Sequence, residues 1–305
     1  AYYAYLFQSS VGSMKSIPKA KKIITKALNT SRSALLTLAK KRPELFSRSS
    51  LLASTTNTPK EILASLEKAI QSNFPATSKT NYTVRYVPKS LENFLSPAFY
   101  LTPPIDNSTD NVIYINGSTK YENSNLFPTL AHEGFPGHLY QSVYLSEHLS
   151  SPLQGTLNFG GYTEGWATYA EIYSFQFAGL EKEVVEILRN NTIVSLCLYT
   201  LCDIGIHYEG WDLTQTGKFL ERYGITDVTD ILTVYQNLID EPSSYPKYCM
   251  GYLEILELKK KAKKLLGKKY TDKAFHTWFL SMGPSWFDVL DAYMEPWFKE
   301  NGNET

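Results

Sequence analysis

The sequence has no excess of charge of either sign and contains little cysteine. Thirty basic and thirty acidic residues give a formal net charge of zero over 305 residues, so neither nucleic acid nor an anionic membrane is an expected partner. The three cysteines, Cys197, Cys202 and Cys249, include no Cys-x-x-Cys pair. An odd and sparse cysteine count argues against a disulfide framework, and we predict buried free thiols.

The chain also lacks a long apolar run, an internal repeat and a low-complexity linker. No stretch reaches the roughly 18 apolar residues that a membrane-spanning helix needs, so no span is predicted. The first residue is Ala1 rather than Met, which leads us to expect a processed or shortened chain. If a targeting segment has been cut away, the cell surface or the exterior is the expected compartment; otherwise it is the cytoplasm.

Length and pattern predict one mainly α-helical domain over residues 1–305, because a chain of this size can bury a single large core. It divides into a helical subregion at 1–78, a small β-sheet at 79–120 and a helical metal-site region at 121–305. The clearest helix start is Thr58-Pro-Lys-Glu61, whose first and last residues form a capping box around a proline suited to the first helical position.

A small antiparallel β-sheet is predicted near residues 81–116. β-Branched and aromatic runs at 82–87, 98–102 and 112–115 are separated by Pro, Asn, Asp and Ser, which is the pattern of short strands joined by turns. An exposed edge of this sheet beside a catalytic site would hold an extended peptide by strand addition. A capping sheet without a ligand is equally consistent with the pattern.

The chemistry of the chain centres on Thr129-Leu-Ala-His-Glu-Gly-Phe-Pro-Gly-His-Leu-Tyr-Gln141. Neutral imidazole is the usual protein ligand for zinc, so His132 and His138 are candidate ligands, and Glu133 is placed to deprotonate a water on the ion. The histidines are six residues apart, however, and this offset turns the two rings about 240° apart on a straight helix. We therefore predict that Pro136-Gly137 break the helix and return the second ring to the face of the first.

Two glutamates farther along the chain complete the predicted site. Glu164 and Glu171 are seven residues apart in a segment of small and aromatic residues, so both lie on one helix face. Glu164 follows His138 by 26 residues, a separation typical of a zinc site whose third ligand is a Glu on the next helix. We predict Glu164 as the third ligand, rather than a surface residue, and Glu171 as a partner that orients a histidine ring.

A second carboxylate–imidazole pair lies in the long helix expected near residues 183–208. Asp203 and His207 are four residues apart, so the carboxylate is placed to fix the tautomer of the histidine and to raise its basicity. The same pattern also suits a purely structural histidine near a helix end. From the residues alone, both interpretations stay open.

Together these motifs resemble those of the bacterial domain of unknown function family 885. The resemblance is carried by the segments His132 to His138, Glu164 to Glu171, Asp203 to His207 and Pro242 to Gly251, and it runs from the first Tyr-Tyr to near the C-terminus. It implies a largely helical, gluzincin-type zinc peptidase with a zincin-like helical fold. Family members are usually longer at the N-terminus, so the chain is expected to be the C-terminal catalytic part.

The resemblance implies a role for each motif residue. His132, His138 and Glu164 become the ligands of a zinc ion, and Glu133 becomes the general base. The expected function is hydrolysis of a peptide substrate by metal-activated water. Two alternatives stay open: a catalytically inactive module that binds a peptide or a partner on a truncated peptidase scaffold, and a metal-dependent amidase or esterase.

The resemblance also raises His207 and Tyr248 as candidates to stabilise the oxyanion of the reaction. The chain departs from the family pattern at one place. After Pro242 the family commonly has Gly-Gln, whereas this chain has Ser243-Ser244. It therefore lacks the glutamine side chain that a family member would present there, although Tyr248 keeps its place.

Overall fold

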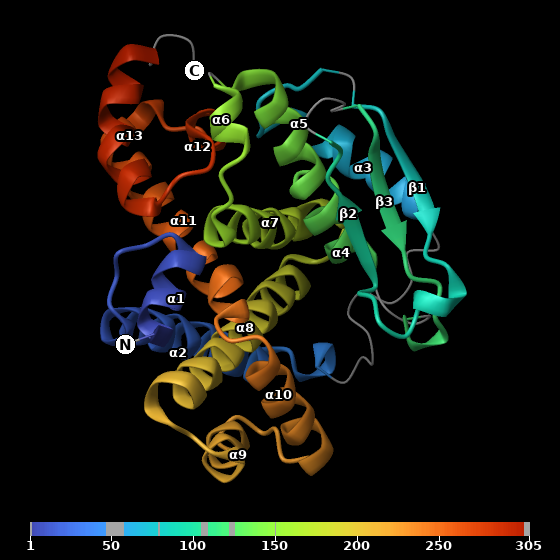
Figure 1. The fold of residues 1–305 in the computed structure, drawn as a ribbon, viewed down its shortest axis with the longest axis vertical. Coiled ribbons are helices and arrows are strands. Elements are labelled where there is room, and N and C mark those ends of the chain that lie inside the picture. Colours follow the sequence, from blue (N-terminus) through green and yellow to red (C-terminus); the bar gives the residue numbers. More distant parts are fainter. Residues whose placement is uncertain are drawn as a thin grey trace.

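The computed structural model describes residues 2–46, 58–78, 80–104, 109–121, 126–149 and 151–301. These residues form a mainly helical protein with a small three-stranded sheet on one side (Figure 1), as the sequence predicts. Within these ranges no helix combines the length and the apolar character that crossing a membrane requires.

The helices and strands follow one another in an order that inserts the sheet between helical segments. The helices are α1 (Tyr2–Val11), α2 (Ile17–Lys41), α3 (Pro59–Ala69), α4 (Leu126–Glu133), α5 (His138–His148), α6 (Pro152–Gly155), α7 (Gly160–Ser174), α8 (Lys182–Glu209), α9 (Leu213–Glu221), α10 (Val228–Asp240), α11 (Ser244–Leu266), α12 (Asp272–Met282) and α13 (Phe287–Asn301). The strands are β1 (Tyr82–Tyr86), β2 (Ala98–Leu101) and β3 (Asn111–Ile115).

One hydrophobic core contains residues from the first helix to the last, and there is a small second cluster.

The predicted capping box is confirmed at the start of α3. The hydroxyl of Thr58 accepts from the Glu61 N–H at 3.3 Å, and the Glu61 carboxylate accepts from the Thr58 N–H at 2.7 Å. The three cysteines are buried and free, which is also as predicted.

The sheet is mixed, so the prediction of an antiparallel sheet was wrong for one of its two strand pairs. The central strand β3 pairs parallel with β1 and antiparallel with β2. The strand positions agree with the prediction to within a residue. Strand direction was not predictable from these runs, because parallel and antiparallel strands show the same alternation of side chains.

The connection between β1 and β2 explains the mixed pairing. This connection is long enough to place β2 one strand position away from β1. The next strand, β3, then pairs with both of them in the position between. Asn116, directly after β3, holds this connection in place. Its side-chain amide donates to the carbonyl oxygens of Glu92 and Leu95, each at 2.8 Å. The edge strand β2 thereby lies next to α4 (Figure 1).

The crossing of α7 and α11 forms the centre of the helical part. A Cβ atom on Gly165 of α7 would lie only 2.5 Å from the carbonyl carbon of Gly251 in α11, and one on Gly161 would lie 2.0 Å from the Val11 carbonyl oxygen. Real Cβ atoms do not approach other atoms this closely, so glycine is required at both positions. The close crossing brings Glu164 of α7 beside the first turns of α11.

We expect Gly165→Ala to lower the free energy of unfolding by about 1–3 kcal/mol, because the added methyl group must push two packed helix backbones apart. Gly217→Ala in α9 is the matched control. A Cβ there meets only Ile231 side-chain atoms at an ordinary 3.5 Å, so this change should be neutral or stabilising. Urea denaturation of both variants measures the difference, and equal stability of the two would contradict the close crossing.

Candidate metal centre

The two histidines of the central motif come from two helices that meet at a break. Helix α4 ends at Glu133 and α5 begins at His138, with four residues between them. A Cβ atom on Gly137 would lie 1.7 Å from the carbonyl oxygen of His132, so only glycine permits the chain to double back here. The predicted break in the helix is confirmed.

Helix α7 holds this break from the other side. The indole Nε1 of Trp166 donates to the carbonyl oxygen of Pro136 at 2.9 Å, and the indole is fully buried. The Phe135–Pro136 peptide bond is cis. Because Trp166 lies two residues after Glu164, the helix that fixes the break also presents a carboxylate to the two histidines.

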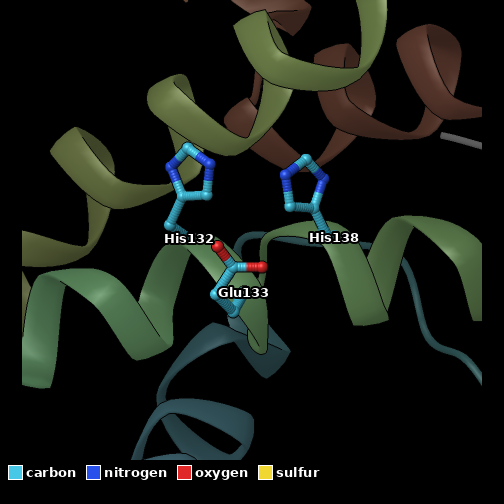
Figure 2. Close-up of side chains that lie close together, drawn as sticks. All are labelled: His132, Glu133 and His138. Atoms are coloured by element: carbon cyan, nitrogen blue, oxygen red, sulfur yellow. The ribbon is translucent and has the colours of Figure 1, made fainter. Parts of the chain in front are cut away.

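The two imidazoles converge on one carboxylate oxygen. Nε2 of His138 lies 3.2 Å from Oε2 of Glu164, and Nε2 of His132 lies 3.5 Å from the same atom. The ring centroids of the two histidines are 4.9 Å apart, and Figure 2 shows the rings rising side by side from α4 and α5. Oε2 of Glu164 is buried and has no hydrogen-bond partner among the described residues.

Glu133 lies between the two rings at the end of α4 (Figure 2). One ligand atom each from His132, Glu133 and His138 lie within 4.8 Å of one another, so these three residues are close enough to hold a metal ion. One Glu133 oxygen already has a partner, because Oε2 accepts from the main-chain N–H of Tyr100 in β2 at 2.9 Å. The edge strand of the sheet therefore touches the centre directly.

Glu171 lies on the other side of the first histidine. Its Oε2 is 3.2 Å from Nδ1 of His132, so the Nε2 atom of that ring is the one turned toward Glu164. Burial favours the neutral ring, but the carboxylates of Glu164, Glu171 and Glu133 outweigh burial and raise the pKa of His132 to about 10. Burial likewise opposes ionisation of Glu164, yet His132 and His138 outweigh it and lower the pKa of Glu164.

Tyr248 comes to the centre from the second turn of α11. Its ring stacks on that of His132, with the centroids 6.1 Å apart and the planes at 26°. Burial raises the pKa of Tyr248, and the charges of Glu164 and Glu133 and a side-chain hydrogen bond to Glu164 raise it further. Its hydroxyl therefore keeps its proton at neutral pH and can donate a hydrogen bond.

The structure brings Asp203 and His207 together with each other but not with the centre. Nε2 of His207 donates to the Leu238 carbonyl oxygen at 2.8 Å, and its ring stacks on Tyr3. Asp203 is fully buried, accepts from the Tyr3 hydroxyl at 2.6 Å and from the Ser243 N–H at 3.2 Å, and has its pKa raised by burial. In the part of the chain that the structure describes, His207 has no hydrogen bond, ion pair or ring contact with the candidate ligands.

Two cavities flank the centre. The first has a volume of about 790 Å³, is bounded by His132 and Tyr248, and carries the carboxylates of Glu171, Asp240 and Glu241. The second has a volume of about 700 Å³. Its walls include His138, Glu164, Gln141, Tyr100 and the Thr102–Pro104 segment. A chain-like ligand that reaches from one cavity to the other would pass over the centre.

Two residues of this region were not identified by sequence reasoning. Gln141 lies one turn after His138, so helical spacing counted from the second histidine is a signal that points to it. Tyr100 contacts Glu133 through its main-chain N–H, and the pattern of side chains carries no signal for such a contact. Ser244, where the family commonly has Gln, lies in the wall of the first cavity.

Comparisons with known proteins relate the whole fold to other bacterial chains. A solved structure from Colwellia psychrerythraea, described as a "putative lipoprotein", is similar with a TM-score of 0.80 and 20% identity, over 98% of this chain and 55% of that one. A "putative lipoprotein of unknown function" from Shewanella oneidensis is similar with a TM-score of 0.73 and 20% identity, over 96% of this chain and 59% of that one. At this identity the likeness concerns the fold alone. No curated protein matches the chain.

This chain spans less than two thirds of the length of those two proteins. A family model described as "Bacterial protein of unknown function (DUF885)" matches residues 8–294, a range that includes every residue of the candidate centre. The chain therefore belongs to this family, DUF885.

Proposed function

We propose that this protein is a zinc-dependent, gluzincin-type peptidase whose ion is held by His132, His138 and Glu164. The observation that carries the proposal is the position of Oε2 of Glu164. This atom is buried, has no hydrogen-bond partner among the described residues, and is faced by Nε2 of both histidines at 3.5 and 3.2 Å. Two imidazoles and one carboxylate make up the donor set of a catalytic zinc site that keeps one position open.

Glu133 is the competing third ligand, since one of its oxygens is also within reach of both imidazoles. We assign it the role of general base instead, for two reasons. Its Oε2 is already engaged by the Tyr100 N–H, and Oε2 of Glu164 has no well-formed hydrogen bond with the described residues. Because the Tyr100 N–H holds Oε2, we assign the Oε1 atom of Glu133 to accept the proton.

The roles of the side chains in hydrolysis follow from these positions. A bound zinc ion would lower the pKa of a water toward about 7 and polarise the substrate carbonyl. Glu133 takes the proton from the attacking water and delivers it to the leaving amine. Tyr248, whose hydroxyl stays protonated, donates a hydrogen bond to the oxyanion that develops on the carbonyl.

The edge strand β2 supports a peptide as the substrate. The strand order β1–β3–β2 leaves one side of β2 without a strand partner in the described sheet. Tyr100 turns its N–H to that side, where it meets Glu133. An extended peptide that pairs with the other outward main-chain groups of β2 would therefore run along the centre. Assays of peptides beside ester and amide substrates separate this proposal from an esterase or an amidase.

We expect the protein to bind about one zinc ion per chain and to lose thermal stability when a chelator removes it, because the ion binds only the folded state. Glu164→Gln should lose the zinc. Glu133→Gln should retain the zinc and lower kcat by about 10²–10⁴-fold, the contribution typical of general acid–base catalysis. Metal analysis and peptide hydrolysis of both variants provide the measurement.

The two variants act as controls for each other, since each removes one carboxylate of the same centre. The reverse result, with zinc lost only from Glu133→Gln, would make Glu133 the ligand. Wild-type protein that neither binds zinc nor gains stability from added zinc would contradict the proposal and favour a catalytically inactive binding module.

We expect Tyr248→Phe to keep its zinc and to lower kcat by about 10²–10³-fold, because it removes a donor to the oxyanion. His207→Gln is the informative comparison, since the resemblance to the family raised both residues for this role. We expect it to change stability rather than kcat, because the ring contacts Tyr3 and the Leu238 carbonyl. A loss of kcat in His207→Gln at unchanged Tm would assign the oxyanion donor to His207.

We also propose that the protein works at the cell envelope, because both solved relatives are described as "putative lipoproteins". Fractionation of bacteria that express the native gene, followed by immunodetection, tests the location. Recovery of the protein with the envelope fraction is the expected result. Recovery only with cytoplasmic marker proteins would contradict it.

A further inference from the structure

We infer that Gln141 is a substrate-binding residue that donates from its side-chain amide to a main-chain carbonyl oxygen of the peptide. The contact lies in the second cavity, on the His138 side of the centre. This inference rests on the proposed peptidase function and names a residue that positions the substrate beside the cleaved bond.

The position of Gln141 follows from the start of α5. His138 is the first residue of this helix, and Gln141 comes three residues later, so both side chains leave the same face of the helix. Both line the second cavity, together with Tyr100 of the edge strand and Glu164. The amide therefore lies in the wall of a cavity of about 700 Å³ that begins at the centre itself.

The amide nitrogen of Gln141 makes no well-formed hydrogen bond within the described fold, although the Tyr162 hydroxyl lies near the Gln141 side chain. The residue is only 2% exposed, and its Nε2 has no hydrogen bond. Buried donors in folded proteins are almost always paired, because an unpaired donor has lost its hydrogen bond to water without replacement. Gln8, which is only partly buried, has a paired amide, since its Nε2 donates to the Met14 carbonyl oxygen at 3.2 Å. Because Gln141 also lines the second cavity, its unpaired amide lies close to a ligand that enters there.

The chemistry of the cavity selects the acceptor. Among the described residues, its lining contains no Lys, Arg or Asp, and His138 and Glu164 are assigned to the metal ion. A neutral acceptor is therefore favoured at Gln141 over a carboxylate of the substrate, which would find no basic side chain of the described lining as its counter-ion. The main-chain carbonyl is the neutral acceptor that every peptide brings to the residue beside the cleaved bond. Tyr100 of the edge strand β2, whose N–H donates to Glu133, forms part of the same wall.

Gln141→Met tests the inference, because it removes the donor while keeping a similar side-chain length. We expect an unchanged zinc content and an equal or higher Tm, since Nε2 makes no well-formed hydrogen bond with the described residues. With a library of N-acetylated, C-amidated peptides, kcat/KM should fall about tenfold. The fall should not depend on the side chains beside the cleaved bond. In the control, Gln8→Met, the loss of a paired donor should lower Tm and leave kcat/KM unchanged.

Each other outcome overturns the inference in a recognisable way. Equal kcat/KM for Gln141→Met and wild type would show that Gln141 makes no contact with the substrate. A lower Tm together with loss of zinc would make Gln141 a structural residue. If kcat/KM falls only for peptides with Asn, Gln, Ser or Thr beside the cleaved bond, Gln141 binds a side chain of the substrate rather than its main chain. Absence of hydrolysis by the wild type would instead overturn the proposed function, and this inference with it.

Discussion

The candidate centre depends on one close approach of the main chain, that of Gly137 to the carbonyl oxygen of His132. There is no room for a Cβ atom at this point, so the reversal between α4 and α5 exists only because residue 137 is glycine. Without the reversal, the six-residue offset would turn the second ring away from the first. With it, Nε2 of both His132 and His138 reaches the same oxygen of Glu164.

A single helix, α7, then completes the arrangement from three positions along its length. Glu164 meets both imidazoles, Trp166 donates to the Pro136 carbonyl within the break, and Glu171 meets Nδ1 of the first histidine. Placing these groups on one rigid element fixes their spacing, which suits a site that must hold its ligands before the ion arrives. Gly165 of the same helix permits the close crossing with α11, and this crossing brings Tyr248 to the centre.

The sequence was most informative where the spacing of residues did not fit a regular helix. The six-residue offset between the histidines requires a break in the helix if both rings are to meet, and Pro136-Gly137 can form such a break. The division into α4 and α5 could therefore be predicted from the sequence. The direction of β1 was not predictable, since five alternating residues pair equally well either way. The pairing of Asp203 was also hidden from local patterns. Its closest partner, the Tyr3 hydroxyl, lies 200 residues away in the chain, whereas the i, i+4 spacing pointed only to His207.

Asp203 stabilises the main chain at Ser243, the position at which this chain departs from the family pattern, and thereby influences the centre. Ser243 has a φ of 64°, in the left-handed region that costs a non-glycine residue about 1–2 kcal/mol and that suits the glycine common in the family. The buried Asp203 carboxylate accepts from the Ser243 N–H at 3.2 Å, and the Ser243 hydroxyl lies 2.6 Å from that of Ser10. These bonds offset the cost of the turn and fix the residue at the N-cap position of α11, whose side chain makes no capping hydrogen bond. Since Tyr248 follows in the second turn of that helix, Asp203 acts on the centre through the placement of α11 rather than through a histidine.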